Sequence, residues 1–483
     1  MSSFDDAPAR GLVLRLAANS LAQAGGSFLA AVVGFLTFVA VTRGLGPAAY
    51  GHLTAATAFL FIPTVLAEAG LSAALLRQIS ARPEETEHAL RASLPLRALI
   101  ALVALIAALG IALVSPLPYL TKVAIAISAV GSLCTLLTQS LMPVLQAQLK
   151  MHLSVAATLA GRLLTLGLTL GVLAAGLGFK SVVAAQVAGA VLVLVLHAAI
   201  VGRLVPLRPL VDTAYWRRLV TGSLALGLAI ALSQAYFRID AVLLALLRDA
   251  YEVGLYGAAY KFIEISELLV VAIPISVFPP LARFVATGDP RATVLVQRAF
   301  DVMLAAAAPL AVGMVVFAEP VVVAAAGEEF REGADALRLL GPFVLFSFVN
   351  GLLFRILMAH GRDKLLLATT GTVLVANVVL NLVFIPVYGF RAAAVVSVVT
   401  EMLVLVPLAV AARRRGLAPR LGYVPVVAAA AGLMAGVGLL VPGPALIAMA
   451  ASSVVYLGTV LLLPGTARDV AFRHLLPWLR RGE

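Results

Sequence analysis

Charged residues and cysteines are scarce in this chain. Of its 483 residues only 12% are Asp, Glu, Lys or Arg, whereas 62% are hydrophobic. A soluble protein of this size cannot bury so much apolar surface, because surface area still grows steeply with mass. The single cysteine, Cys134, excludes an internal disulfide, and the six scattered histidines give no metal-ligand or nucleophile pattern. We therefore expect a membrane protein that has no metal and no cofactor and is not an enzyme.

Apolar runs follow one another almost end to end. A helix needs about 20 apolar residues to cross a bilayer, and the sequence supplies about fourteen such runs. The first run is too long for a signal peptide and leads directly into the next, so we interpret it as a span. We therefore predict an all-α integral membrane protein. The predicted spans are 13–41, 50–73, 93–115, 121–145, 153–176, 181–202, 219–247, 254–281, 300–326, 337–359, 365–387, 392–411, 422–441 and 444–464.

The basic residues lie mostly between the predicted spans, on one side of the membrane. The chain has 35 Lys and Arg against 23 Asp and Glu. With the N-terminus inside, most of the basic residues fall in segments predicted to be cytoplasmic, as the positive-inside rule requires. The polybasic stretch 413–415 is an example. The net charge of +12 therefore sets membrane topology, with both termini cytoplasmic, and does not indicate a nucleic-acid partner.

The chain repeats itself in two halves. The stretch 44–51 (GLGPAAYG) has a counterpart at 252–260 (EVGLYGAAY), and the next helix is predicted to end at Arg77 in one half and Arg283 in the other. Gly178 and Phe179 are echoed by Gly389 and Phe390. Repeated bundles in a membrane chain are typical of transporters whose sites lie between the repeats.

This repeat predicts the domain organisation. Residues 1–208 would form one six-helix bundle and residues 209–415 a second, joined by a cytoplasmic linker rich in Pro and Arg. Residues 416–466 would add two further helices, and 467–483 would form a basic cytoplasmic tail.

Several short motifs occur in a characteristic order. They lie at 43–51, 238–240, 253–261, 327–330 with 337–340, and 377–389. Together they resemble the polysaccharide-export and oligosaccharide-flippase branch of the multidrug/oligosaccharidyl-lipid/polysaccharide (MOP) exporter superfamily over nearly the whole chain. Arg391 before Ala392 departs from that family, in which a glycine commonly precedes paired alanines.

The resemblance implies a fold and a function. It implies two six-helix bundles around a V-shaped cavity, in a bacterial inner membrane. It also implies alternating access that moves a polyprenyl-diphosphate-linked oligosaccharide between leaflets, coupled to a cation gradient. Partners would be the bilayer, the lipid-linked cargo and polysaccharide polymerase or export machinery. Because both halves of the cavity lie in one chain, we expect a monomer.

A diphosphate cargo needs cations away from bulk water, and arginine binds phosphate through its planar fork. Arg238 is the first candidate, because an intramembrane charge is costly and usually faces an interior. Gln234 lies four residues earlier and would share its face on a continuous helix, whereas Asp240 would meet another helix. The alternative is that Arg238 forms a structural ion pair. Arg162 is a second candidate, with snorkelling to the cytoplasmic surface equally favoured.

Carboxylates within spans are candidates for cation coupling. Glu264 and Glu267 lie one turn apart, where crowding and desolvation would raise one pKa, although Lys261 and Glu264 would equally make a structural pair. Glu68, Glu401 and Asp240 are further candidates. For Glu68 and Glu401 we slightly favour a protonated, hydrogen-bonded carboxyl at a helix interface.

Asn377 and Asn381 share a helix face. Interhelical hydrogen bonding is the usual role of such residues, and sugar contact is the alternative.

Two other functions compete with the flippase interpretation. Multidrug or organic-cation export would favour a cavity of carboxylates and aromatics, and Arg238 and Lys261 argue for an anionic cargo instead. A membrane polysaccharide polymerase or ligase would need catalytic residues in a large external loop, which the spacing of the spans does not leave.

Overall fold

The computed structural model describes residues 6–68, 70–441 and 443–462. Within them, only the backbone is described for residues 6–22, 24, 225–226, 228–230, 233 and 268–276. The described residues are mostly helical and contain no strand, as the sequence predicts. Eleven helical ranges among them are long and apolar enough to cross a membrane. The predicted tail at 467–483 lies outside the described residues.

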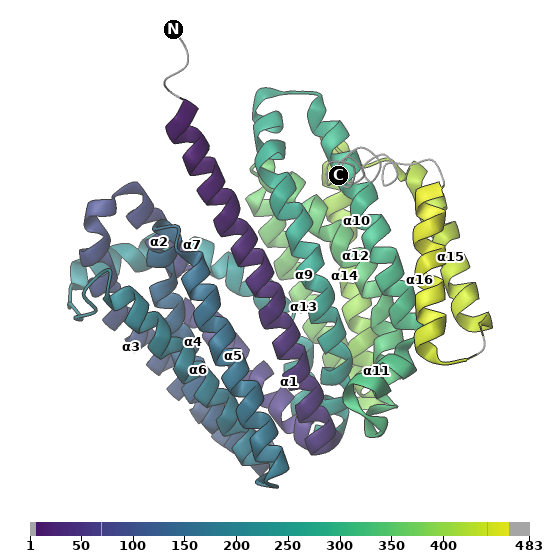
Figure 1. The fold of residues 1–483 in the computed structure, drawn as a ribbon, viewed down its shortest axis with the longest axis horizontal. Helices are drawn as coiled ribbons and strands as arrows, with labels where there is room; N and C mark the ends of the chain where they lie inside the picture. Colours follow the sequence, from purple (N-terminus) through teal and green to yellow (C-terminus); the bar gives the residue numbers. More distant parts are fainter. Residues whose placement is uncertain (1–5, 69, 442, 463–483) are drawn as a thin grey trace. The chain divides into compact units, whose positions relative to one another are not determined.

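The chain packs as two compact units, residues 1–251 and 252–483. Figure 1 colours the first unit from purple to teal and the second from teal to yellow. Helices suit a hydrocarbon environment, because their backbone hydrogen bonds are formed within each segment. The helices of the first unit are α1 (Asp6–Glu68), α2 (Leu71–Ala81), α3 (Thr86–Val114), α4 (Tyr119–Ala147), α5 (Met151–Ala174), α6 (Gly178–Gly202), α7 (Thr213–Tyr236) and α8 (Ile239–Leu247).

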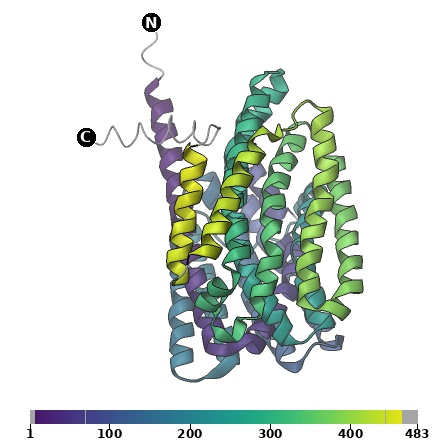
Figure 2. The same ribbon diagram turned by 90° about the vertical axis from the view of Figure 1, so that its right-hand side faces the viewer.

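The second unit begins within α9 (Ala250–Thr287). Its last two helices, yellow in Figure 2, pack against α10 through a cluster that includes Tyr423, Met434 and Tyr456. The hydroxyl of Tyr456 donates to the carbonyl of Ala305 at 2.8 Å. The remaining helices are α10 (Arg291–Val316), α11 (Ala318–Ala326), α12 (Gly333–Ala359), α13 (Asp363–Tyr388), α14 (Phe390–Arg414), α15 (Val424–Leu440) and α16 (Ala445–Leu462).

Two predicted spans are joined in α1. Its helix is interrupted at Gly46, whose φ of 74° and ψ of 175° lie outside the helical region. Residues that have a side chain rarely adopt that φ, so glycine permits the break. Pro47 suits the first position of the helix that follows. The motif at 44–51 is therefore the corner between two spans, as predicted.

The internal repeat is visible in the helix ends. Helix α2 ends at Ala81 and α9 ends at Thr287, each four residues beyond the basic residue predicted to end it. Gly178 and Gly389 both have positive φ, 78° and 60°, where α6 and α14 begin. Both pairs keep the spacing seen in the sequence, so the repeated residues mark repeated backbone geometry.

The assignment of residues to two six-helix bundles stays a prediction. The segment before α7 is held against the first unit rather than hanging as a linker. The amide of Leu210 donates to the carbonyl of Arg91 at 2.9 Å, and the indole of Trp216 donates to the carbonyl of Ala92 at 2.8 Å. Asp212 caps α7 by accepting from the Tyr215 amide at 2.9 Å. That hydrogen bond holds the pKa of the Asp212 carboxyl below its usual value.

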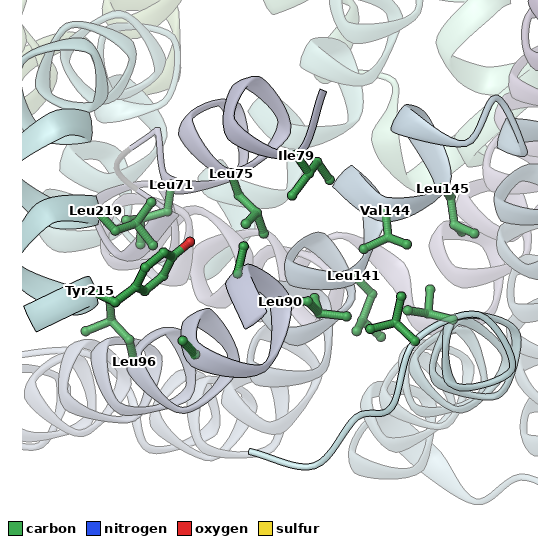
Figure 3. Packing of buried hydrophobic residues seen from close by; sticks show 14 of the residues in the cluster. Leu71, Leu75, Ile79, Leu90, Leu96, Leu141, Val144, Leu145, Tyr215 and Leu219 are labelled. Atoms are coloured by element: carbon green, nitrogen blue, oxygen red, sulfur yellow. The ribbon is translucent and has the colours of Figure 1, made fainter. Parts of the chain in front are cut away.

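An apolar cluster explains why α7 packs with the first unit. Leu71, Leu75 and Ile79 form one face of α2, four residues apart, and are buried. Figure 3 shows this face meeting side chains of α3, α4 and α7. Those side chains include Leu90, Leu96, Leu141, Val144, Leu145, Tyr215 and Leu219.

Candidate functional site

The predicted helix over 219–247 is broken at Arg238. Helix α7 ends at Tyr236 and α8 begins at Ile239, with Arg238 at φ −131° and ψ −9° between them. The expectation that Gln234 and Arg238 share one continuous helix face is therefore wrong. Arg238 and Asp240 lie where the break occurs. A broken helix leaves backbone amides that polar side chains can satisfy.

Around this break each polar residue has a distinct environment. Arg238 is half-buried, and its guanidinium carbon lies 5.4 Å from the ring centroid of Phe61 on α1. That distance is in the range of a cation–π contact. Gln234 is exposed. Asp240 is buried in the first turn of α8 and accepts from the Ala241 amide at 2.7 Å, a position that the helix dipole favours for an acid.

Arg162 lies on α5 against a glycine of α1. Its Nη1 atom is 3.3 Å from where a Cβ of Gly34 would stand. Gly26 and Gly44 face Val155 and Leu173 of α5 in the same way, so the two helices run parallel in register. Arg162 is exposed, and glycine at 34 leaves room for the guanidinium beside α1.

Glu68 is paired with Arg97. Glu68 at the end of α1 accepts from the Ser72 amide at 2.9 Å, and its other oxygen accepts from Arg97 Nη2 of α3. Arg97 Nη2 also donates to Ser72 Oγ at 2.7 Å. The Arg97 side chain is 4% exposed and that of Glu68 21%. Glu68 is hydrogen-bonded at a helix interface, as slightly favoured, but its partner is a cation. The Glu68–Arg97 ion pair, together with Ser72, joins α1, α2 and α3.

Arg97 is not among the site residues that the sequence predicts. The signal was present, because Glu68 lies near the inner end of one predicted span and Arg97 near the inner start of the next. Antiparallel neighbours bring such residues to the same depth. Arg97 Nη1 is also buried and makes no hydrogen bond to the part of the chain that is described.

The Lys261 and Glu264 side chains meet on α9. Lys261 Nζ lies 2.7 Å from Glu264 Oε2, which is the ion pair expected as the alternative to a coupling site. Both side chains are about a quarter to a third exposed, at 32% and 25%. Glu267, one turn further, is half-buried. In this group of three side chains, the carboxylate of Glu264 lies beside the ammonium of Lys261, and Glu267 supplies the second carboxylate.

The second unit contains a buried polar ladder. Asn377 Nδ2 donates to Thr400 Oγ1 at 3.2 Å, and Asn381 Nδ2 donates to Asn377 Oδ1 at 2.8 Å. Beside them, Asn350 Nδ2 of α12 donates to Glu401 Oε2 at 2.5 Å. Asn377, Asn381 and Glu401 are at most 2% exposed. These contacts join α12, α13 and α14, in the manner of interhelical hydrogen bonds in membranes.

Asn350 and Thr400 had no assigned role either. No sequence pattern connects Asn350 with Glu401, since they come from helices separated by the whole of α13. Thr400 lies next to Glu401, but a threonine in an apolar run is ordinary. Among the described residues no cluster of three metal-ligating side chains occurs.

Family models match the sequence over much of its length. The model described as polysaccharide biosynthesis protein matches residues 16–285, and the model described as MatE matches residues 225–383. A search of curated proteins found no significant match.

Solved structures share the fold. The lipid II flippase MurJ in an inward closed conformation is 14% identical, with a TM-score of 0.79 over 93% of this chain and 99% of that one. An inward-facing MATE-family multidrug resistance transporter of the MOP superfamily is 16% identical, with a TM-score of 0.65 over 80% and 94%. A MOP superfamily transporter from Pyrococcus furiosus is also 16% identical, with a TM-score of 0.60 over 83% and 95%.

The fold is therefore that of the MOP-type flippases and exporters, as the motifs predict. Since the first family model matches more than half of the sequence, the chain belongs to the polysaccharide biosynthesis protein family. The eleven long apolar helical ranges among its described residues are those of a multi-pass membrane protein.

Proposed function

We propose that this protein moves a polyprenyl-diphosphate-linked oligosaccharide from the inner to the outer leaflet of a bacterial inner membrane. The cargo would serve surface polysaccharide biosynthesis. The family match over residues 16–285 carries the proposal. The flippase with the same fold is named for lipid II, which supports a lipid cargo. Both termini would be cytoplasmic, and the monomer would hand its cargo to polymerase or export machinery.

Two arginines are proposed to receive the diphosphate. Arg238 stands at a helix break, where its guanidinium is positioned against Phe61 and remains half-buried. Arg162 lies exposed on the first unit. Arginine suits a diphosphate because it donates two parallel hydrogen bonds. Gln234, exposed near the same break, would contact the first sugar.

Asn377 and Asn381 stay second candidates for sugar contact. Both are buried and hydrogen-bonded in the described arrangement of α13 and α14. They would reach a sugar only if those hydrogen bonds open during transport.

Coupling to a cation gradient is proposed for the carboxylates in the spans. Glu264 and Glu267 are the leading pair, with Lys261 holding Glu264. Asp240 and Glu401 are buried carboxylates. A proton or metal cation would reach them only in a conformation of the transport cycle that exposes them. Glu68 is shared with Arg97, so it would exchange a cation only if that ion pair opens.

The role of Arg238 has a direct test. Arg238→Ala is expected to abolish translocation while leaving membrane insertion and protein level intact, and Arg238→Lys is expected to restore part of it. The ammonium keeps the charge but loses the planar fork. Translocation at the normal rate by Arg238→Ala, at normal expression, contradicts the assignment.

The first experiment is on a deletion strain. Polyprenyl-linked oligosaccharides are extracted and their leaflet is determined with a membrane-impermeant glycosidase. Accumulation of complete intermediates in the inner leaflet, with surface polymer lost and restored by the intact gene, is the expected result. Normal polymer and a normal leaflet distribution exclude the proposal.

Export of organic cations is the second candidate. The MatE model matches residues 225–383, and multidrug transporters share the fold. In the same deletion strain this function predicts new sensitivity to cationic drugs with unaltered polysaccharide.

A further inference from the structure

The hairpin of α15 and α16 lies outside the two repeated halves of the sequence. It holds none of the residues proposed for cargo or coupling. It packs on α10 through a buried apolar cluster, and the middle of α10 carries one proline, Pro309. Four α10 residues of that cluster, Leu304, Ala305, Ala308 and Val312, surround this proline in the helix. The hairpin therefore covers α10 around Pro309.

Pro309 makes a weak point in α10. Proline has no backbone N–H, so the carbonyl of Ala305, four residues earlier, receives no hydrogen bond from that position, and the proline ring pushes this carbonyl aside. No water replaces the missing donor inside hydrocarbon. A helix with such a gap can bend or open there unless a neighbouring group supplies the hydrogen bond.

Tyr456 of α16 supplies that hydrogen bond. Its hydroxyl donates to the carbonyl of Ala305 at 2.8 Å, and the residue is only 2% exposed. The donor is thus held by the packing of the hairpin and is shielded from solvent. It stands in for the backbone N–H that Pro309 lacks.

The hairpin is also attached to α10 on both sides of Pro309. Before the proline, the side-chain amide of Gln297 donates to the carbonyl of Arg420 at 3.0 Å and accepts from the Arg420 amide at 2.6 Å. Beyond the proline, a Cβ at Gly438 of α15 would stand 3.0 Å from Val316, so the absence of a side chain permits this close approach. These contacts extend over about 30 Å of helix at 1.5 Å per residue.

The same arrangement occurs twice in the first unit. Pro143 of α4 frees the carbonyl of Gln139, and Ser72 Oγ of α2 donates to it at 3.1 Å. Pro95 of α3 likewise frees the carbonyl four residues before it, and the amide of Leu210 donates to that oxygen at 2.9 Å. The recurrence indicates that this fold regularly replaces a donor lost to proline from a neighbouring element.

We propose that the α15–α16 hairpin is a splint that keeps α10 from hinging at Pro309, with Tyr456 as its positioning residue. Helix α10 and the hairpin then move as one rigid piece of the second unit. These contacts lie within that unit, so the splint holds whatever cargo the protein moves.

Hydrogen–deuterium exchange tests the splint, on the full-length protein in nanodiscs of phosphatidylethanolamine and phosphatidylglycerol. The readout is the exchange rate of the backbone amides at 310–313, in the turn that follows Pro309. Tyr456→Phe keeps the ring and removes only the donor. It is expected to raise this rate about five-fold, the equilibrium factor of one net hydrogen bond. An unchanged rate overturns the proposal.

Tyr423→Phe is the matched control. Tyr423 lies in the same buried cluster, and its buried hydroxyl makes no hydrogen bond to the part of the chain that is described. Its removal is expected to leave exchange at 310–313 unchanged. An equal rise in both variants would show a general loosening of the cluster and exclude the role of Tyr456.

Pro309→Ala provides the rescue. Alanine restores the backbone N–H, so α10 can donate to the Ala305 carbonyl itself. Tyr456→Phe added to Pro309→Ala is therefore expected to leave exchange at the level of Pro309→Ala alone. If the Tyr456 hydroxyl matters only for packing, Tyr456→Phe raises exchange equally in both backgrounds, and that result excludes a splint at the proline.

Discussion

Removal of Arg97 is expected to destabilise the first unit strongly. The guanidinium is 4% exposed and donates to both Glu68 and Ser72, so Arg97→Met leaves a carboxylate that is only 21% exposed without its cation. Breaking a buried ion pair from one side costs about 3–5 kcal/mol. Because Glu68 keeps some exposure, we expect about 3 kcal/mol, a factor of roughly 150 in the unfolding equilibrium.

The reciprocal and double variants test the cause. Glu68→Gln is expected to cost at least as much, because the charge that remains, on Arg97, is the more buried of the two. Glu68→Gln combined with Arg97→Met leaves no charge behind. It is expected to regain most of the loss, since replacing both members of a buried pair is often nearly neutral.

Cys134 provides the assay. It is the only cysteine in the sequence and is buried, so a thiol-reactive dye reports its exposure on heating in detergent. Arg82→Met is the control, because Arg82 pairs with Glu85 at the surface, with its side chain 67% exposed, and surface pairs contribute little. Arg97→Met that exposes Cys134 at the same temperature as Arg82→Met, or a double variant no more stable than the single ones, would refute the reasoning.

Two further outcomes are expected. The pKa of Asp212 is lowered by its hydrogen bond from the Tyr215 amide, so the stability it contributes is present above the unfolded pKa of about 3.9 and is lost as pH falls through the lower folded value. Asp212→Asn should weaken that acid dependence in thermal unfolding between about pH 5 and 2, and an unaltered profile contradicts it. Gly161→Ala should destabilise by about 1–3 kcal/mol, because the new Cβ would stand 2.9 Å from the carbonyl oxygen of Gly189. Gly171→Ala on the same helix meets nothing within 4 Å, and equal Cys134 exposure temperatures for the two variants would exclude close α5–α6 packing as the cause.

The sequence predicts which charged residues lie within the spans, but not what they contact. The types and depths of Arg238, Glu68 and Glu401 follow from their places in apolar runs, because a charge there is unusual wherever it points. Their partners do not follow. Glu401 meets Asn350 across two helices that are not adjacent in the sequence, and Glu68 meets Arg97 through the packing of α1 against α3.

The helix break at Arg238 shows the limit of periodicity. Hydropathy over 219–247 is continuous, so a pattern argument predicts one helix and places Gln234 and Arg238 on one face. The backbone instead ends α7 at Tyr236 and restarts at Ile239, with Asp240 accepting from the Ala241 amide. Apolar content alone does not report where a helix of this kind is broken.

Sequence by itself determined the membrane class, the spacing of the repeat and the junction at 44–51 between the first two spans. These features depend on the length and order of the apolar runs. Tertiary structure alone decided which charges neutralise one another and which donors reach the carbonyls that prolines leave free. Those relations join residues far apart in the chain, and they exist only once particular helices pack at a particular register.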